Sequence, residues 1–337
     1  MKLLARFKAV IGGAGIYFFL LVSCGEPKDK PSIEEPKPNE TLEHIKVPVF
    51  NETMAFNLIK KQVEFGPRVP NMESHRKCGD FLVKTFSSLA DTVIIQKANV
   101  TAFDGKTLKI RNIIASFNPS EKSRVMLSAH WDTRPFSDQD SKQKTTPIAG
   151  ANDGASGVAV LLEIARQLKE SPAKVGVDII LFDAEDYGQP DGLMQKEVSD
   201  SYCLGSQYWA KNLHQEGYMP KYGILLDMVG GPMATFTQEG GSVANAPDVV
   251  NKVWKAAARI GFSNYFVNEQ TRAITDDHFY INSIANIPTI DIIQFDRSTP
   301  SNFYNHWHTL QDTPENIDPL TLKAVGQTLL EVVYREK

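Results

Sequence analysis

Acidic and histidine side chains recur directly after short apolar runs that are typical of buried strands. The residues that could do chemistry are His130, Glu185, Asp186 and Asp227 after such runs, Asp153 where a helix opens, and His308 in the loop before the last helix. Imidazole and carboxylate groups are ligands that zinc takes without any cysteine. In open α/β sheets, sites form outside the carboxyl ends of the strands. The pattern therefore indicates a zinc site assembled from several strand ends.

Two neighbouring acids, Glu185 and Asp186, suggest a division of labour within such a site. Adjacent carboxylates repel one another, so a bound cation would relieve a real cost. One acid can bind metal while its neighbour moves protons. Taken singly, each residue also has an ordinary structural interpretation: Asp153 as a helix N-cap, Asp186 as a solvated loop acid, His308 as a satisfied histidine. Their combination at successive strand ends favours the site.

The elements that must position these residues alternate along the chain. Apolar patterns predict helices at Glu52–Val63, Glu73–Leu89, Gly154–Leu168, Cys203–Leu213, Val249–Ile260 and Leu320–Val333. They predict strands at Thr92–Thr101, Leu108–Phe117, Arg124–Ala129, Val177–Phe182, Gly223–Met228 and Pro288–Gln294. This order predicts one α/β domain over residues 47–337, with a mixed, mostly parallel central sheet flanked by helices. Long loops at 131–150, 186–202 and 295–319 are typical of functional segments.

Composition sets limits on the class of protein. The chain has 337 residues, 36 Lys+Arg and 40 Asp+Glu, which gives a net charge of −4. This balance offers no electrostatic footprint for nucleic acid. The 3 cysteines are too few for a disulfide-built scaffold. Cys78 and Cys203 either pair outside the cytoplasm or remain separate buried thiols, and neither lies in a motif typical of cysteine catalysis.

The first residues predict export. Lys2, Arg6 and Lys8 precede the apolar run Ala9–Val22, which is shorter than the ~20 residues of a spanning helix. The run ends in Leu-Val-Ser-Cys24, which resembles the lipobox of bacterial lipoproteins, although an ordinary signal ending in a cysteine remains the alternative. We expect a signal peptide at 1–23, lipidation of Cys24 and a proline-rich tether at 24–46. The protein would be an exported lipoprotein on the periplasmic side of a membrane or at the cell surface, touching the membrane only through its lipid.

A family resemblance follows from the order of the motifs. They are His130-Trp-Asp132, Gly150-Ala-Asn-Asp153-Gly-Ala-Ser-Gly157, Phe182-Asp-Ala-Glu185-Asp186, Leu204-Gly-Ser206, Leu226-Asp227 and Trp307-His308-Thr309. They resemble the motifs of the zinc aminopeptidases of bacterial leucyl type, a superfamily that also contains the glutaminyl-peptide cyclotransferases. The resemblance covers nearly all of residues 50–335. It implies an α/β/α sandwich.

The resemblance also implies roles for single residues. Asp153, Asp186 and His308 match the zinc ligands of the cyclotransferases, and Glu185 matches their general acid/base. Asp227 matches an acid that hydrogen-bonds near the substrate. The residues implied for the rest of the site are Asp276 in the hydrogen-bond network, Trp307 in the substrate pocket and, as a further aromatic suited to that wall, Phe303.

Some positions depart from the animal cyclotransferases. Asp291 falls where they carry a histidine, which predicts a carboxylate in place of an imidazole near the substrate. The loop after Asp186 lacks their tryptophan, so Trp131 or Trp209 could supply an aromatic instead. His130 matches a ligand of the second zinc in the peptidases. It serves either a second metal or, as we favour, a hydrogen bond around a single one.

The resemblance implies an enzyme that cyclises N-terminal glutamine of peptides or proteins to pyroglutamate and releases ammonia, with one zinc. The alternative is a hydrolytic aminopeptidase with two zincs. A non-catalytic binding module is disfavoured because every ligand position is intact. We expect a monomer without nucleic-acid partners.

Overall fold

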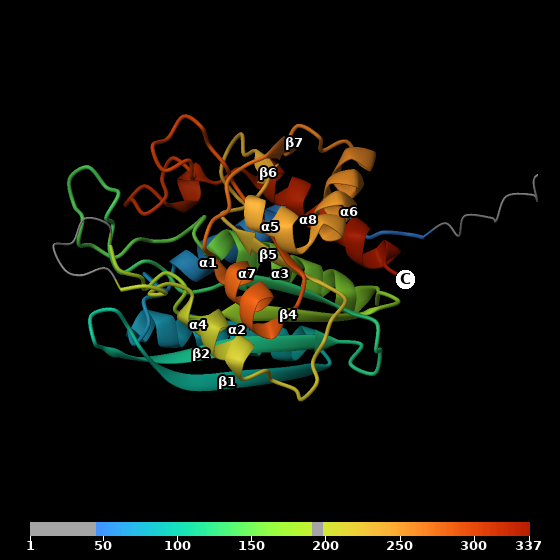
Figure 1. Cartoon of the computed structure of the whole chain (residues 1–337), viewed down its shortest axis with the longest axis horizontal. Coiled ribbons are helices and arrows are strands. Elements are labelled where there is room, and N and C mark those ends of the chain that lie inside the picture. The colour runs from blue at the N-terminus through green and yellow to red at the C-terminus, as the bar shows by residue number, and fades with distance from the viewer. Residues whose placement is uncertain (1–44, 191–197) are drawn as a thin grey trace, which may run out of the picture. The chain divides into compact units, whose positions relative to one another are not determined.

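The computed structural model describes residues 45–190 and 198–337 (Figure 1). The predicted signal peptide, Cys24 and the tether as far as residue 44 lie outside the described residues. Residues Ile45–Lys337 group as one unit. Within the described part of the chain, no helix has the length and apolar character needed to span a membrane.

The helices and strands alternate through most of this unit. The helices are α1 (Glu52–Val63), α2 (Glu73–Leu89), α3 (Ala155–Glu170), α4 (Leu204–Lys211), α5 (Gly240–Asn245), α6 (Pro247–Arg259), α7 (Asp277–Tyr280) and α8 (Pro319–Arg335), with a π-helix η1 (Ile281–Ala285) and a 3-10 helix η2 (Pro314–Asn316). The strands are β1 (Thr92–Thr101), β2 (Thr107–Phe117), β3 (Arg124–His130), β4 (Gly176–Phe182), β5 (Gly223–Asp227), β6 (Phe236–Gln238), β7 (Phe266–Gln270) and β8 (Thr289–Ile293).

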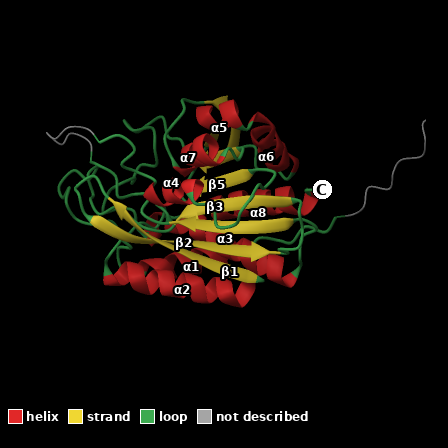
Figure 2. Ribbon diagram, turned by 60° about the horizontal axis from the view of Figure 1, so that its bottom comes forward, coloured by secondary structure: helices red, strands yellow, loops and turns green. Residues whose placement is uncertain are grey.

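The main sheet has six described strands in the order β1-β2-β4-β3-β5-β8. Figure 2 shows β1, β2, β3 and β5 stacked in this order from the bottom of the view upward. β1 and β2 form an antiparallel hairpin, and β2 also runs antiparallel to β4. β4, β3, β5 and β8 are parallel. The predicted mixed, mostly parallel sheet is therefore confirmed, and the carboxyl ends of its four parallel strands share one edge.

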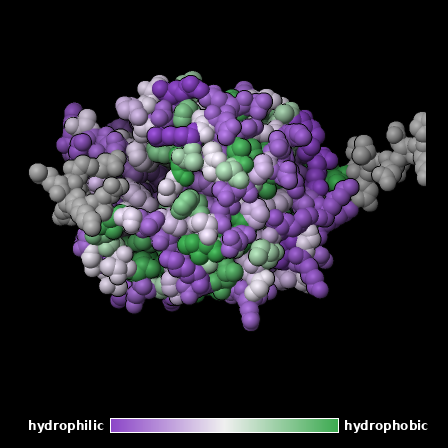
Figure 3. Space-filling view, viewed as in Figure 1, coloured by the Kyte–Doolittle hydropathy of each residue, from purple (hydrophilic) through white to green (hydrophobic). Residues whose placement is uncertain are grey.

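Alternation along the central strands gives the sheet two buried faces. Val125, Leu127 and Ala129 of β3 join a large core with α1, α2, α3 and α8, whereas Met126 between them joins a smaller cluster on the other face. Residues on the outer surface are mixed, with hydrophilic and hydrophobic side chains interspersed over the face in Figure 3. Burial on both faces explains why these strands are almost continuously apolar in sequence.

Most predicted elements coincide with observed ones, and the bounds of α1, α2 and β1 agree to the residue. The sequence analysis missed β6, β7, α5 and α7, which are only three to six residues long. Such short elements carry too few residues to establish a period, and β6 and β7 pair with each other in a separate small sheet. Cys78 and Cys203 are free buried thiols, so the alternative of a disulfide between them is wrong.

Candidate active site and metal centre

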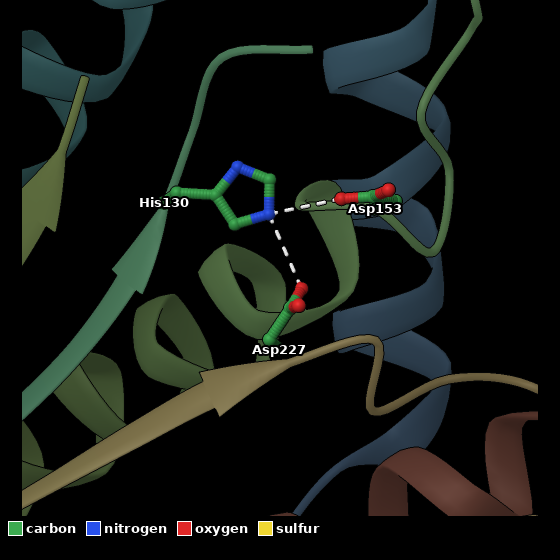
Figure 4. Close-up of side chains that lie close together, drawn as sticks. All are labelled: His130, Asp153 and Asp227. Atoms are coloured by element: carbon green, nitrogen blue, oxygen red, sulfur yellow. Dashed lines mark hydrogen bonds and ion pairs between the residues drawn. The ribbon is translucent and has the colours of Figure 1, made fainter. Parts of the chain in front are cut away.

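Three side chains from different parts of the fold meet at the carboxyl edge of the sheet. Figure 4 shows His130 at the end of β3, Asp227 at the end of β5 and Asp153 in the loop before α3. His130 Nε2 lies 3.0 Å from Asp153 Oδ1 and 3.2 Å from Asp227 Oδ1. β4, the next strand along the chain, pairs with one side of β3, and β5 pairs with the other side. α/β folds place ligands at such a switch in strand order.

A second cluster shares Asp153 with the first. His308 Nε2 lies 3.0 Å from Asp186 Oδ1 and 3.7 Å from Asp153 Oδ2. All three side chains are at most 3% exposed. The two oxygens of Asp153 therefore face different histidines, with Oδ1 toward His130 and Oδ2 toward His308. This arrangement can serve one metal beside His308 or two metals bridged by Asp153.

The second cluster fits zinc on its own contacts. Asp153 Oδ2 and Asp186 Oδ2 are buried without a hydrogen-bond partner among the described residues, which is rare for polar atoms in a protein interior. Burial and the nearby Asp153 carboxylate raise the pKa of Asp186 to about 6. Burial would lower the pKa of His308, but Asp186 and Asp138 outweigh it and raise that pKa to about 9. Two carboxylates and an imidazole around unsatisfied oxygens make a suitable zinc donor set.

Two buried carboxylates hold the backbone on which these residues stand. Asp132 accepts the backbone N–H groups of Glu185 and Asp186, at 3.0 and 3.2 Å. Asp312 accepts those of Asn152 and Asp153, at 2.7 and 3.0 Å. The loop positions of the acidic side chains therefore depend on two further buried acids, of which Asp132 also has Oδ1 3.7 Å from His130 Nδ1.

Other neighbours fix the two histidines. Asp138 Oδ1 lies 3.2 Å from His308 Nδ1, and the other Asp138 oxygen accepts from Arg134 at 2.8 Å. A Cβ at Gly154 would lie 2.5 Å from the His130 ring, so the motif needs glycine next to Asp153 to let the imidazole approach. Partners of this kind orient metal-binding imidazoles.

Glu185 lies beside the clusters in an environment suited to carrying a proton. Burial raises the pKa of Glu185 well above its usual range. His130 opposes this shift, and the nearby Asp186 and Asp276 add to it. A carboxyl group whose pKa is raised in this way accepts a proton more readily than an exposed glutamate and can return it.

The second cluster and Glu185 line one cavity of about 280 Å³. This volume is near the lower end of the ~300–1,000 Å³ of small-molecule pockets. Its polar lining consists of Asp153, Glu185, Asp186, Tyr202, Asp227, Thr275, Asp276 and His308. Its apolar lining consists of Met228, Ile274, Ile293, Phe303 and Trp307. The Trp307 ring stacks on His308 with centroids 3.9 Å apart, and Phe303 packs on Trp307 at 4.8 Å. The predicted aromatic residues thus lie in the cavity wall with the ligands.

Tyr202 also lines this cavity and was missed by the sequence analysis. The expectation that Trp131 or Trp209 supplies the additional aromatic is wrong. Trp131 is buried and stacks on His75, and Trp209 packs on Phe182 in the core of the opposite face. The available signal was the place of Tyr202 at the end of a long loop, next to the Cys-Leu-Gly-Ser motif.

Asp276 and Asp291, which the sequence analysis grouped near the substrate, have carboxylate oxygens within 4.8 Å of one another, but they differ in their access to the cavity. Asp276 caps α7 and lines the cavity. Asp291 is fully buried within β8, and the described cavity lining does not include it. Burial, with Asp276 and Asp227 nearby, raises the pKa of Asp291 well above its usual range. Asp291 is therefore placed behind the wall rather than in it.

Comparison with known proteins gives relatives of two kinds, peptidases and glutaminyl cyclases. The family model of peptidase family M28 matches residues 112–333. A Zn-dependent exopeptidase from Parabacteroides distasonis is 50% identical, with a TM-score of 0.85, covering 86% of this chain and 100% of that one. Bacteroides thetaiotaomicron glutaminyl cyclase bound to N-acetylhistamine is also 50% identical, with a TM-score of 0.85, covering 87% and 100%. A Drosophila melanogaster glutaminyl-peptide cyclotransferase is 25% identical over 76% of this chain and 73% of its own length.

Proposed function

The chain belongs to peptidase family M28, and from this premise we propose that it is a zinc-dependent glutaminyl-peptide cyclotransferase that converts N-terminal glutamine to pyroglutamate. One observation carries the proposal. Glu185, the Asp153–Asp186–His308 cluster and the aromatic wall of Trp307 open into the same small cavity. The 50% identity with a Bacteroides glutaminyl cyclase over the whole of its solved chain supports the same activity.

The cavity suits the terminal residue of a peptide. Its carboxylates accept hydrogen bonds from the N–H groups of the α-amine, which reacts in its neutral form. Phe303 and Trp307 offer apolar area for the methylene groups of the glutamine side chain, and they exclude water from that wall. A side chain folded back in this space brings the α-nitrogen to the γ-amide carbon, so the reaction is intramolecular and much of its entropy cost is met by binding.

Asp153, Asp186 and His308 would hold one zinc ion, which acts as a Lewis acid toward the γ-amide oxygen when bound. Glu185 takes a proton from the α-amine as the new nitrogen–carbon bond forms. It then returns that proton to the amide nitrogen as the old bond breaks and ammonia leaves. Water is not consumed. Asp227 and Asp276, which share the cavity, orient the α-amine toward Glu185.

The purified protein tests this proposal with two amide substrates. We expect ammonia release from glutamine β-naphthylamide and no release of leucine from leucine p-nitroanilide. Release of leucine at a comparable rate would refute the proposal. The variant Glu185→Gln should lose activity while it keeps its zinc, and loss of zinc in that variant would reverse the roles of Glu185 and Asp186.

A di-zinc aminopeptidase is the second candidate, because one observation favours it. His130, Asp153 and Asp227 offer a further set of three ligand atoms, all within 4.8 Å of one another. Under the cyclotransferase proposal, His130 instead hydrogen-bonds the two carboxylates around a single zinc. Metal analysis of the active protein separates the two: one zinc per chain supports the cyclotransferase, and two support the aminopeptidase.

We further propose that the enzyme is an exported lipoprotein anchored through Cys24. The basic start, the short apolar run and the Leu-Val-Ser-Cys motif support this location. Its substrates would then be exported proteins in which signal cleavage exposes glutamine. Labelling with a radioactive fatty acid tests the anchor, and Cys24→Ser should abolish the label. Unchanged N-terminal pyroglutamate in a deletion strain would refute the substrate class.

A further inference from the structure

One of the two free thiols lies against the proposed proton carrier. Cys203 Sγ is 3.2 Å from Glu185 Oε1. The backbone holds it there, because Cys203 N donates to Glu185 O at 2.8 Å and Leu204 N donates to Ala184 O at 3.0 Å. Cys203 itself has a left-handed backbone, with φ of 58°, immediately before α4. The start of α4 is thus fastened to the segment that carries Glu185.

The contact is notable because the Glu185 side chain has little else to hold it. Among the described residues, Cys203 Sγ is the one hydrogen-bond donor to the Glu185 carboxylate. The Asp132 carboxylate fixes only the backbone N–H of Glu185. The other close groups are His130, whose Nδ1 lies 3.9 Å from Oε2, and the acid Asp276. Apart from this thiol, no described residue donates a hydrogen bond that would select one orientation of the Glu185 carboxylate.

The sulfur acts as a donor rather than as a nucleophile. Cys203 is fully buried, and burial together with the Glu185 charge raises the pKa of its thiol well above the usual range. The proton therefore stays on sulfur at working pH, and the thiolate needed for metal binding or covalent catalysis is disfavoured. A thiol is a weak, uncharged donor. It can orient a carboxylate without the strong loss of basicity that a cationic neighbour would cause.

We propose that Cys203 is a positioning residue for proton transfer, whose S–H donates to Oε1 of Glu185 and leaves Oε2 to exchange the proton with the substrate. The inference rests on the proposed role of Glu185 as the proton carrier. It assigns to the buried thiol a part in turnover, and none in zinc binding or in holding the fold.

The chain supplies a matched control for the test. Cys78 is also a fully buried free thiol, but it lies on the buried face of α2 and packs in the main core. Kinetics should be measured on full-length Cys203→Ala, Cys203→Ser and Cys78→Ala, together with zinc content and the midpoint of thermal unfolding. For Cys203→Ala we expect kcat to fall by about 10- to 100-fold, the range for a small misplacement of a reacting group. KM and zinc content should change little, and Cys203→Ser should recover most of the loss.

Cys78→Ala should lower the unfolding midpoint but keep its kcat. Wild-type kcat in Cys203→Ala overturns the inference, as does Cys203→Ser that folds but is no more active than Cys203→Ala. A second readout needs no change at residue 203: the infrared S–H stretching band should shift between wild type and Glu185→Gln, and an unshifted band also overturns it. A wild-type protein that releases no ammonia refutes the proposed activity instead, and it leaves the infrared result to decide the contact.

Discussion

The Asp138 carboxylate makes a prediction about zinc affinity that needs no activity assay. Asp138 Oδ1 lies 3.2 Å from His308 Nδ1, on the side of the ring opposite Nε2, which faces Asp186. The other oxygen accepts from Arg134, whose guanidinium is fully buried. In Asp138→Asn the amide keeps the shape of the side chain but loses the charge, and an NH2 group, which cannot accept, replaces one of the two oxygens that face His308 and Arg134.

The expected size follows from these contacts. Loss of a carboxylate partner typically weakens metal binding of an imidazole by about 10- to 100-fold, which corresponds to about 1.4 to 2.8 kcal/mol. Because His308 is one of three proposed ligands and the contact is buried, we expect a zinc dissociation constant in this range above that of wild type. Arg134 keeps its bonds to the backbone oxygens of Asp186 and Gly188, so the fold should persist.

Competition with a fluorescent zinc chelator measures the affinity directly. Asp91→Asn is the control: it removes an exposed carboxylate that accepts the backbone N–H of Asn118 at 2.7 Å, away from the proposed zinc ligands. We expect the control to bind zinc like wild type, and His308→Ala to bind more weakly than either variant. Unchanged zinc affinity in Asp138→Asn would refute the reasoning that this acid orients His308.

Three further outcomes follow from the same structure. Trp307→Ala should raise KM for glutamine substrates about tenfold, through loss of the wall beside His308, with zinc content unchanged in metal analysis. Tyr202→Ala should also raise KM, whereas Trp209→Phe, in the core of the opposite face, should leave kinetics unaltered. Burial would raise the pKa of Glu336, but its hydrogen bonds to Lys221, Lys252 and Tyr222 lower it to about 2. The ionised Glu336 carboxylate therefore stabilises the fold at pH values above its ordinary pKa of 4.5. This contribution is lost as the pH falls toward 2. The free energy of unfolding of Glu336→Gln should therefore be about 1–2 kcal/mol below that of wild type at pH 7. Urea titrations should show this difference in unfolding free energy shrinking below pH ~4.5.

The sequence predicted the parts of the site that follow from local pattern. His130 and Asp227 end strands whose apolar runs are visible in the sequence, and parallel strands must bring such ends to one edge. Asp153 ends no strand, but it lies in the loop that leaves β3 at this edge, just before α3. His308 could be linked to them only through the family resemblance, because it lies in a loop far along the chain.

The residues that the sequence did not reveal act through tertiary contacts. Asp132 and Asp312 hold backbone N–H groups of other segments, which no spacing rule detects. Tyr202 reaches the cavity because a long loop returns to it. Cys203 contacts Glu185 because the start of α4 pairs with the end of the β4 segment. Each of these contacts depends on how the loops fold back in space, and hydrophobic periodicity reports only local secondary structure.

The most direct test of the proposed activity is mass spectrometry of one peptide with N-terminal glutamine after incubation with the zinc-loaded enzyme. The account predicts a product that keeps every residue and has lost one ammonia. A product shortened by its N-terminal residue would contradict it, because the same site would then be hydrolysing the peptide bond instead of closing the glutamine ring.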